Sequence, residues 1–570
     1  MLNTIEIKVR DNIFLRGLSY IQNPKKGCLT ILSCSPYRNF ENNKKYIQSF
    51  GKFLSSIPAN YIYIDIRGTG ESEGDSNNEY SVKELKDTNE IIQYIRSQPW
   101  SNKYVMMHGI SYSACNALQA TTLPNGPDCL FIMHVSDNRW SNDVHYIGGV
   151  KTITEDINYA FATTGQNILP CLTCVDNKLR TNIKPWYMKW FTQGSKKNNE
   201  WKRGLTNKLP PTFLICGWRD SYSYTAVNLS HKSTYTLIGP FGHNCPKQHN
   251  ILIKKWIHHL FSENKNINRI ENYNGPLCVI IPTPRSLWNK GYYQVKSYHK
   301  PNYKIVLNND TKIILKPDLV GETLETYATG DPVSTPSLRT VRNDLTKNNY
   351  GYEKEIILEE CGVWGEPEIT LKCCEYEKGD YIVARLTTIC GESLCVGVSR
   401  IHKGVVKFKL KPFFIPVGTY KIYLFLNRSW TPVLFPTTNS KDITIVSLKL
   451  SLPIIETTDL VKLNVYAHES EMSLLEDVDI INIQNQNGKL LYETNNEYPD
   501  GSFSEHVKIY SILGQGTNVV VENKYVQGEY EIKTITEINN TSTDIYDVII
   551  KAYNHNILLN AWSEHFVIDK

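Results

Sequence analysis

The stretch that decides the fold runs from Lys103 to Gln119 and reads KYVMMHGISYSACNALQ. It predicts an apolar strand over Tyr104–Met107, a sharp turn over Gly109–Tyr112 and a helix over about Ser113–Ala120. A strand that turns abruptly into a helix around one serine is the layout that holds a serine hydroxyl clear of the backbone as a nucleophile. We therefore interpret Ser111 as a candidate nucleophile, against the alternative of an ordinary strand–helix turn.

Apolar strands and amphipathic helices alternate on both sides of this stretch. Strands are predicted over Cys28–Ser35, Tyr61–Ile66, Cys129–Val135, Thr212–Trp218 and Thr234–Ile238, and helices over Phe40–Ile57, Tyr80–Ser97 and Pro246–Phe261. This alternation predicts βαβ units and a mostly parallel sheet. Active sites of such sheets gather outside the carboxyl ends of the strands.

Two further polar residues follow predicted strands. Asp220 comes after the strand that ends at Trp218, and His243 comes after the strand that ends at Ile238. An Asp in such a place is most often a helix cap, and a lone His there is most often structural. The order Ser111, Asp220, His243 is nonetheless the chain order of nucleophile, acid and histidine in α/β-hydrolases, and each residue stands close to a glycine.

Composition excludes several other classes. Lys+Arg 62 against Asp+Glu 57 is nearly balanced over 570 residues, which disfavours a nucleic-acid partner. No apolar run reaches the ~18 residues of a membrane span, and the N-terminus alternates like a first strand rather than a signal peptide. We therefore expect a cytoplasmic protein with no membrane partner.

Cofactor and metal signals are weak. The 14 cysteines are scattered, and the one C-x-x-C, Cys171–Cys174, has no second pair at zinc spacing, so we expect buried free thiols and no metal. The glycine-rich run Arg67–Gly74 lacks both the Lys-Ser/Thr of a P-loop and the spacing of a dinucleotide fold. We expect no cofactor.

Six strings match a known family in their order along the chain. The sequence resembles the cocaine-esterase/X-prolyl dipeptidyl-peptidase type of α/β-hydrolases, the CocE/NonD family, over most of residues 1 to 260. The strings are SPY (Ser35–Tyr37), DIRGTGESEG (Asp65–Gly74), QPW (Gln98–Trp100), GISY (Gly109–Tyr112), GWRD (Gly217–Asp220) and GPFGH (Gly239–His243). The segment Ser136–Gly149 is similar to one that opens the helical cap of bacterial members.

The resemblance implies a role for each site residue. Ser111 is the nucleophile, His243 the general base and then acid, and Asp220 the group that orients the imidazole. The oxyanion hole is formed by the Tyr37 hydroxyl and the backbone N–H of Tyr112. Loss of one such donor typically costs ~10²–10³-fold in rate, so Tyr37→Phe is expected to slow catalysis without changing the fold.

The sequence also departs from the family pattern. Ser113 stands in place of the usual second Gly of the turn, Phe241 in place of a common Trp, and Arg219 where Tyr or Gly is common. The cap looks shorter than in many relatives. Trp186 and Trp190 are candidates for lining the substrate pocket, although an aromatic run of this kind is more often core.

The chain divides into three predicted parts. Residues 1–136 and 208–262 are expected to form the α/β-hydrolase catalytic domain, and 137–207 a short helical cap inserted into it. Alternating segments such as Thr419–Leu426 predict that 276–570 form a C-terminal β-sandwich, and the resemblance implies a jelly roll. We favour one elaborated sandwich over a separate domain for 450–570.

The sequence as a whole predicts a serine hydrolase acting on ester or amide bonds, with a small acyl ester or a peptide-like substrate. One alternative is an X-prolyl dipeptidyl-peptidase, which needs an anionic site for the substrate's amino group that the sequence does not locate. Another is an inactive hydrolase-fold binding protein, against which the intact Ser, Asp and His argue. A homodimer remains open.

Overall fold

The structure is a computed structural model. It describes residues 2–36, 50, 53, 57, 59–74, 79–140, 143, 145–151, 209–218, 220, 222–239, 241, 249–261, 277–295, 302–310, 312–316, 351–377, 380–389, 393–428, 441–463, 488–497, 504–512, 519–527, 530–542, 545–554 and 557–567. Most of the predicted cap and most of the helix expected over Phe40–Ile57 lie outside these residues.

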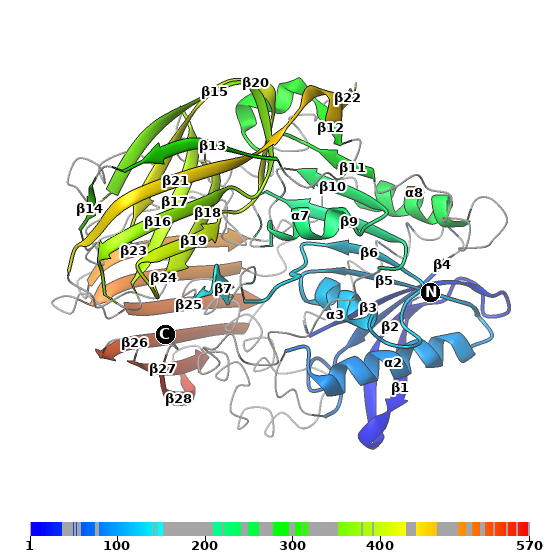
Figure 1. Cartoon of the computed structure of the whole chain (residues 1–570). Coiled ribbons are helices and arrows are strands. Elements are labelled where there is room, and N and C mark those ends of the chain that lie inside the picture. Colours follow the sequence, from blue (N-terminus) through cyan, green and yellow to red (C-terminus); the bar gives the residue numbers. More distant parts are fainter. Residues whose placement is uncertain are drawn as a thin grey trace.

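A mixed sheet of eleven strands carries the first half of the described chain (Figure 1). Its order is β1-β2-β4-β3-β5-β6-β9-β10-β11-β12-β22. The neighbours from β4 to β11 pair in parallel, and the strands at the two edges pair antiparallel. The bounds are β1 (Leu2–Val9), β2 (Ile13–Tyr20), β3 (Cys28–Ser35), β4 (Ala59–Asp65), β5 (Ser101–Ile110), β6 (Cys129–Met133), β9 (Thr212–Gly217), β10 (Tyr235–Gly239), β11 (Leu277–Ile280), β12 (Tyr292–Val295) and β22 (Leu460–Leu463).

Helices cover both faces of this sheet, as a parallel sheet requires. They are α2 (Val82–Ser97), α3 (Tyr112–Ala120), α7 (Thr225–Ser230) and α8 (His249–Phe261). Successive strand residues enter opposite cores: Phe131 of β6 packs with α8, and Ile132 packs with α2, α3 and α7. Strands β3 and β4 are buried along their whole length, which explains their unbroken apolar character.

The sheet extends beyond residue 262, where the sequence placed the end of the catalytic domain. Apolar strand β11 pairs in parallel with β10, with Ile280 opposite Ile238. β12 then pairs with β11, and β22 arrives from residues 460–463 to form the edge. Part of the predicted β domain thus completes the sheet of the α/β unit.

The remaining described chain is all-β. A nine-stranded sheet has the order β18-β17-β20-β15-β21-β16-β19, with β13 and β14 also paired to β21. A six-stranded antiparallel sheet then runs in chain order from β23 to β28 (Figure 1). These strands are β13 (Asn302–Asn309), β14 (Ile313–Leu315), β15 (Gly351–Gly365), β16 (Glu368–Glu375), β17 (Tyr381–Thr388), β18 (Ser393–Arg400), β19 (Val405–Lys409), β20 (Phe413–Asn427), β21 (Ile443–Ile455), β23 (Gly488–Glu497), β24 (Ser504–Ile512), β25 (Val519–Gln527), β26 (Tyr530–Ser542), β27 (Ile545–Asn554) and β28 (Ile557–Val567).

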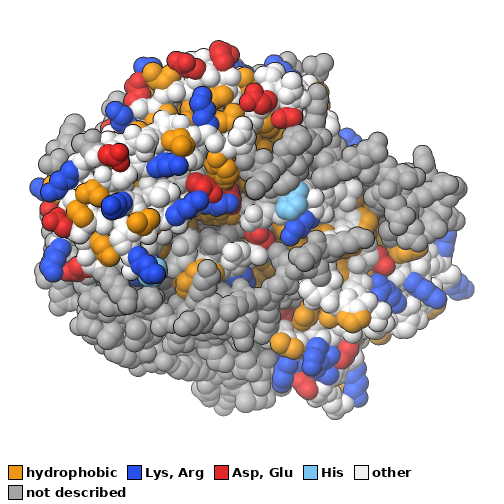
Figure 2. All heavy atoms as spheres, viewed as in Figure 1, with side chains coloured by type: hydrophobic (Ala, Val, Ile, Leu, Met, Phe, Trp, Pro, Cys, Tyr) orange, Lys and Arg blue, Asp and Glu red, His pale blue; other side chains and the backbone are white. Residues whose placement is uncertain are grey.

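The expected fold class, an α/β unit followed by an all-β region, is confirmed, while the jelly-roll topology stays a prediction. Basic and acidic side chains are interspersed over the β region on the face shown in Figure 2. Among the described residues, we find no helix whose length and apolar character would suffice to cross a bilayer.

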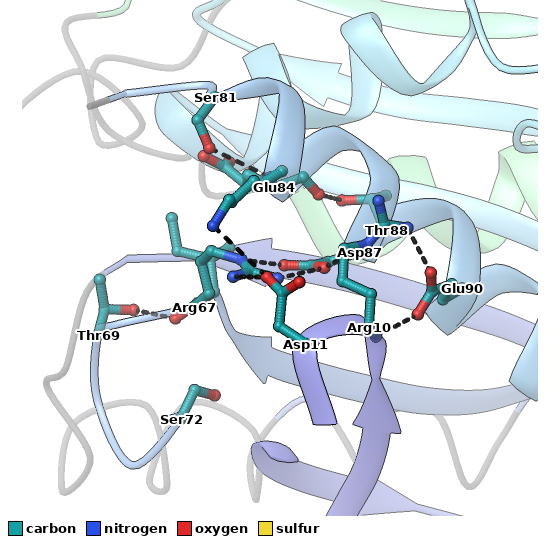
Figure 3. A network of polar contacts seen from close by, with 12 residues as sticks. Arg10, Asp11, Arg67, Thr69, Ser72, Ser81, Glu84, Asp87, Thr88 and Glu90 are labelled. Carbon is teal, nitrogen blue, oxygen red and sulfur yellow. Dashed lines mark hydrogen bonds and ion pairs between the residues drawn. The ribbon is translucent and has the colours of Figure 1, made fainter. Parts of the chain in front are cut away.

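The glycine-rich loop after β4 is fixed by two ion pairs of Arg67, one of them buried. Arg67 donates from Nε and Nη2 to both oxygens of Asp87 on α2, at 2.6 and 2.8 Å, and from Nη1 to Asp11 at 3.0 Å (Figure 3). The N–H of Glu71 donates to the carboxylate of Asp65 at 3.1 Å. The Asp65 carboxylate occupies the turn of this loop, and Arg67 pairs with Asp87 on α2. The loop therefore holds α2 against the sheet.

Candidate active site

Ser111 sits at the sharp turn between β5 and α3, as the sequence predicted. Its backbone has φ 57° and ψ −119°, a conformation that L-residues rarely adopt. The Ser111 carbonyl already accepts the first helical hydrogen bond, from Cys115 N–H at 2.9 Å. A strained serine between a strand and a helix is the geometry of a nucleophile elbow.

The turn explains why Gly109 is needed and why Ser113 can replace the second Gly. A Cβ on Gly109 would lie 2.3 Å from the backbone carbon of Ser113, so only glycine fits. Ser113 Oγ accepts from the N–H of Ile110 at 3.0 Å and donates to its carbonyl at 2.9 Å. Ser113, although it departs from the family pattern, therefore closes the turn with two hydrogen bonds.

Backbone hydrogen bonds join the strand ends that follow one another across the sheet. Ser111 N–H donates to the carbonyl of Met133 at the end of β6, at 3.1 Å. Trp218 N–H, after β9, donates to the carbonyl of Gly239 at the end of β10, at 2.8 Å. The carboxyl ends of β5, β6, β9 and β10 thus form one edge, where the predicted acid and nucleophile both lie.

Asp220 is buried just after β9 and is held from several directions. Its Oδ1 accepts from Tyr222 N–H at 2.8 Å, and its Oδ2 lies 3.1 Å from Nδ1 of His134. Lys411, buried in the β region, donates from Nζ to the backbone carbonyl of Asp220 at 3.4 Å. A carboxylate in such a place is stable only with partners of this kind.

His243, Tyr37, Trp186 and Trp190 lie outside the described residues, so their predicted roles remain predictions. The chain that leads to His243 is partly described. A Cβ on Gly217 would lie 2.1 Å from the carbonyl oxygen of Phe241, which places that part of the chain beside β9.

Tyr112 points its side chain away from the turn. Its ring stacks on Tyr80, with centroids 4.2 Å apart, and its hydroxyl donates to Oε2 of Glu84 at 3.0 Å. Asn116 donates to the other oxygen of Glu84 at 2.9 Å. The Tyr112 side chain thus anchors α3 to α2. The family role would fall to its backbone N–H, one of the first-turn donors that have no acceptor within their own helix.

Glu84 gives this anchor a pH dependence. Burial raises the pKa of Glu84 from 4.5 to about 7. Between these two pH values the folded state binds more protons than the unfolded state, so this group makes the free energy of unfolding fall as pH rises, by up to ~3 kcal/mol. Glu84→Gln is expected to reduce the loss of stability between about pH 5 and pH 8, measured by urea unfolding. An unchanged loss in the variant would contradict this account.

A buried ionic cluster anchors the segment that leads into the predicted cap. Arg139 donates to Glu79 and, at 2.8 Å, to Asp143, and it lies over the ring of Tyr80 at 4.7 Å. His145 Nε2 lies 2.9 Å from Glu79. The cluster therefore ties the cap-opening segment to the same tyrosine stack that holds α3.

Sequence reasoning missed three residues around the site: His134, Lys411 and Glu84. The sequence signal for His134 is that it follows a predicted strand, as Asp220 and His243 do. The signal for Glu84 is its place on the predicted helix over Tyr80–Ser97. Nothing near Lys411 indicates a contact with Asp220. Within the described ranges no group of three or more His, Cys, Asp or Glu residues is arranged to hold a metal ion.

Comparisons with known proteins relate the chain to hydrolases. Residues 22–259 match the family model of X-Pro dipeptidyl-peptidase (S15 family), and this range contains the three predicted triad residues. No curated protein matches the chain.

The solved structures similar to the chain include three that each cover 80% of it. An α-amino acid ester hydrolase has a TM-score of 0.59 at 13% identity, with 96% of that chain covered. An aminopeptidase from the marine sediment archaeon Thaumarchaeota archaeon has 0.58 at 13%, with 96% covered. A CocE/NonD family hydrolase from Staphylococcus aureus has 0.55 at 11%, with 93% covered. At these identities the likeness establishes the fold alone. Together with the family match over residues 22–259, it supports the resemblance indicated by the sequence motifs, that to a hydrolase of the CocE/NonD type.

Proposed function

We propose that this chain is a serine hydrolase that cleaves ester or amide bonds through an acyl-enzyme intermediate. The observation that carries the proposal is the strained conformation of Ser111 at the end of β5, on the same sheet edge as the buried carboxylate of Asp220. A serine hydroxyl needs such exposure from the backbone and a nearby base to act as a nucleophile.

In the proposed reaction, Ser111 Oγ bonds to the substrate carbonyl carbon while its proton passes to His243. The carbonyl electron pair moves onto the oxygen, which the Tyr112 N–H and the Tyr37 hydroxyl stabilise. Collapse of this intermediate expels the alcohol or amine, which takes the proton from His243. Water then attacks the acyl-enzyme by the same route, and Asp220 stabilises the imidazolium in both halves.

The substrate class we favour is a small acyl ester or a peptide-like compound. Two proteins of the same fold are an α-amino acid ester hydrolase and an aminopeptidase, which makes amino-acid esters and amides suitable first candidates. X-prolyl dipeptidyl-peptidase is the second candidate, because the matching family model carries that description.

Further parts of the proposal concern the setting of this reaction. The near-balanced charge argues against a nucleic acid as partner. We include in the proposal a diffusible substrate, a cytoplasmic location and no membrane partner. A homodimer is compatible with this setting. We further propose that the β region is a jelly roll that braces the Asp220 loop, a role supported by the contact from Lys411.

A screen of the purified protein over three substrates tests the proposal: an activated p-nitrophenyl ester, an α-amino acid ester and an X-Pro-coumarin amide. We expect turnover of at least one ester by the wild type and none above background by Ser111→Ala. Release of dipeptide from the coumarin substrate would favour the peptidase. Folded wild-type protein that turns over none of the three would overturn the proposal in favour of the inactive binding protein.

A further inference from the structure

A second histidine lies against the carboxylate of the proposed triad. His134 follows β6 directly, and its Nδ1 is 3.1 Å from Oδ2 of Asp220. Both side chains are almost fully excluded from solvent, at 0% and 1% exposure. The imidazole packs at the end of β9, because a Cβ on Gly217 would lie 3.2 Å from Cε1 of His134.

The backbone that aims this side chain is strained and fixed on both sides. His134 has φ 50°, in the left-handed region, and its N–H donates to the carbonyl of Ile215 at 3.1 Å. The next carbonyl, of Val135, accepts from the Thr225 hydroxyl at 2.6 Å. Strain of this kind persists where the surrounding structure enforces it, and it gathers at functional sites. Ser111, on the neighbouring strand end, shows the same feature.

The carboxylate can serve more than one partner. Its two oxygens offer about four acceptor positions. Tyr222 N–H donates to Oδ1 at 2.8 Å, and Nδ1 of His134 lies 3.1 Å from Oδ2. A triad acid must hold the base imidazole in one tautomer and one orientation, so fixing the plane of the carboxylate matters directly for the rate.

We propose that His134 is a positioning residue, whose buried imidazole lies against Oδ2 of Asp220 and fixes the carboxylate that orients the catalytic histidine; this inference rests on the proposed function. An imidazole N–H this close to Oδ2 also draws charge from the carboxylate and so moderates the basicity of the histidine that Asp220 orients. Charged groups among the described neighbours include Lys411, on the Asp220 carbonyl, and Asp137, which accepts from the Thr225 hydroxyl at 3.1 Å.

His134→Leu removes the imidazole at similar size and tests the proposal. We expect kcat to fall by ~10–10²-fold with little change in KM, because a small misplacement of a catalytic group costs about that much. The acid limb of the kcat/KM profile should move upward by ~0.5 pH unit, a fraction of what a whole neighbouring charge produces. His134→Asn places an amide N–H where Nδ1 lies, and it should return kcat to within a few-fold of the wild type.

His108→Leu is the matched control. His108 is also buried, on β5, where its Nδ1 lies 3.1 Å from the Ser33 hydroxyl rather than beside Asp220. This variant should lose stability while the acid limb stays in place. Titration with a fluorophosphonate corrects every rate for the fraction of active protein.

Each outcome has a defined meaning. A wild-type protein that no fluorophosphonate labels defeats the proposed function and this inference together. A labelled wild type with unchanged kcat and acid limb in His134→Leu defeats the inference alone. If His134→Asn is as inactive as Ser111→Ala, His134 is the base of the reaction, and its positioning role is overturned.

Should His134→Leu not fold, the wild type supplies its own readout. In the NMR spectrum of the wild type, the Nδ1 proton resonance of His134 is the one that disappears in His134→Asn. This resonance must shift in Asp220→Asn, and a resonance that does not shift overturns the inference.

Discussion

Replacing Ser111 by Ala is expected to lower kcat for ester hydrolysis by about 10⁶-fold, the scale on which loss of a triad serine acts. The variant keeps the small side chain and the turn that Gly109 and Ser113 close, so it should fold like the wild type. Steady-state turnover of a p-nitrophenyl ester at high enzyme concentration measures the effect. A residual rate above water is expected, because binding and the oxyanion hole remain.

Ser19→Ala is a suitable control for this experiment. Ser19 is as buried as Ser111, at 5% against 7% exposure, but it lies on β2 near one edge of the sheet. Its hydroxyl donates to the backbone carbonyl of Asn3, at 3.3 Å. Equal losses of kcat in the two variants would show that packing, and not a nucleophile, was removed.

Asp220→Asn is expected to lower kcat by about 10⁴-fold at an almost unchanged KM, since the wrong tautomer of the base is then favoured. The structure gives the reason in detail. The Asn carbonyl must replace Oδ1 to keep the hydrogen bond from Tyr222 N–H. The amide NH₂ then stands where Oδ2 lies, and it presents donors to imidazoles that need an acceptor.

Asp380→Asn is the matched control for Asp220→Asn. Asp380 is also wholly buried, but it pairs with Arg428 in the β region at 2.8 Å. Breaking such a pair destabilises the fold, while kcat per folded molecule should stay at the wild-type value. A tenfold or smaller loss of kcat in Asp220→Asn would contradict the role assigned to this carboxylate.

Local patterns predicted the elements of the α/β unit closely. The buried strand over Cys28–Ser35 has the same bounds in the structure, and the helix expected over Ser113–Ala120 is α3, which begins at Tyr112. The strand is a largely apolar run and the helix follows a glycine-marked turn, so the neighbouring sequence carries the signal. The strained turn at Ser111 follows from the same local reasoning.

Contacts between distant segments could not be predicted in this way. The edge strand β22 comes from residues 460–463, and no pattern there indicates pairing with β12. The approach of Lys411 and His134 to Asp220 depends on how separate segments pack, which hydrophobic periodicity does not encode. A histidine after a strand gives the same sequence pattern whether its side chain faces solvent or a buried carboxylate.

Labelling with a fluorophosphonate, followed by peptide mapping, tests the central claim most directly. The probe bonds to an activated serine and needs no knowledge of the natural substrate. The account predicts one modified residue, Ser111, and no labelling of Ser111→Ala. Modification of a different residue, or labelling of Ser111→Ala at full strength, would contradict it.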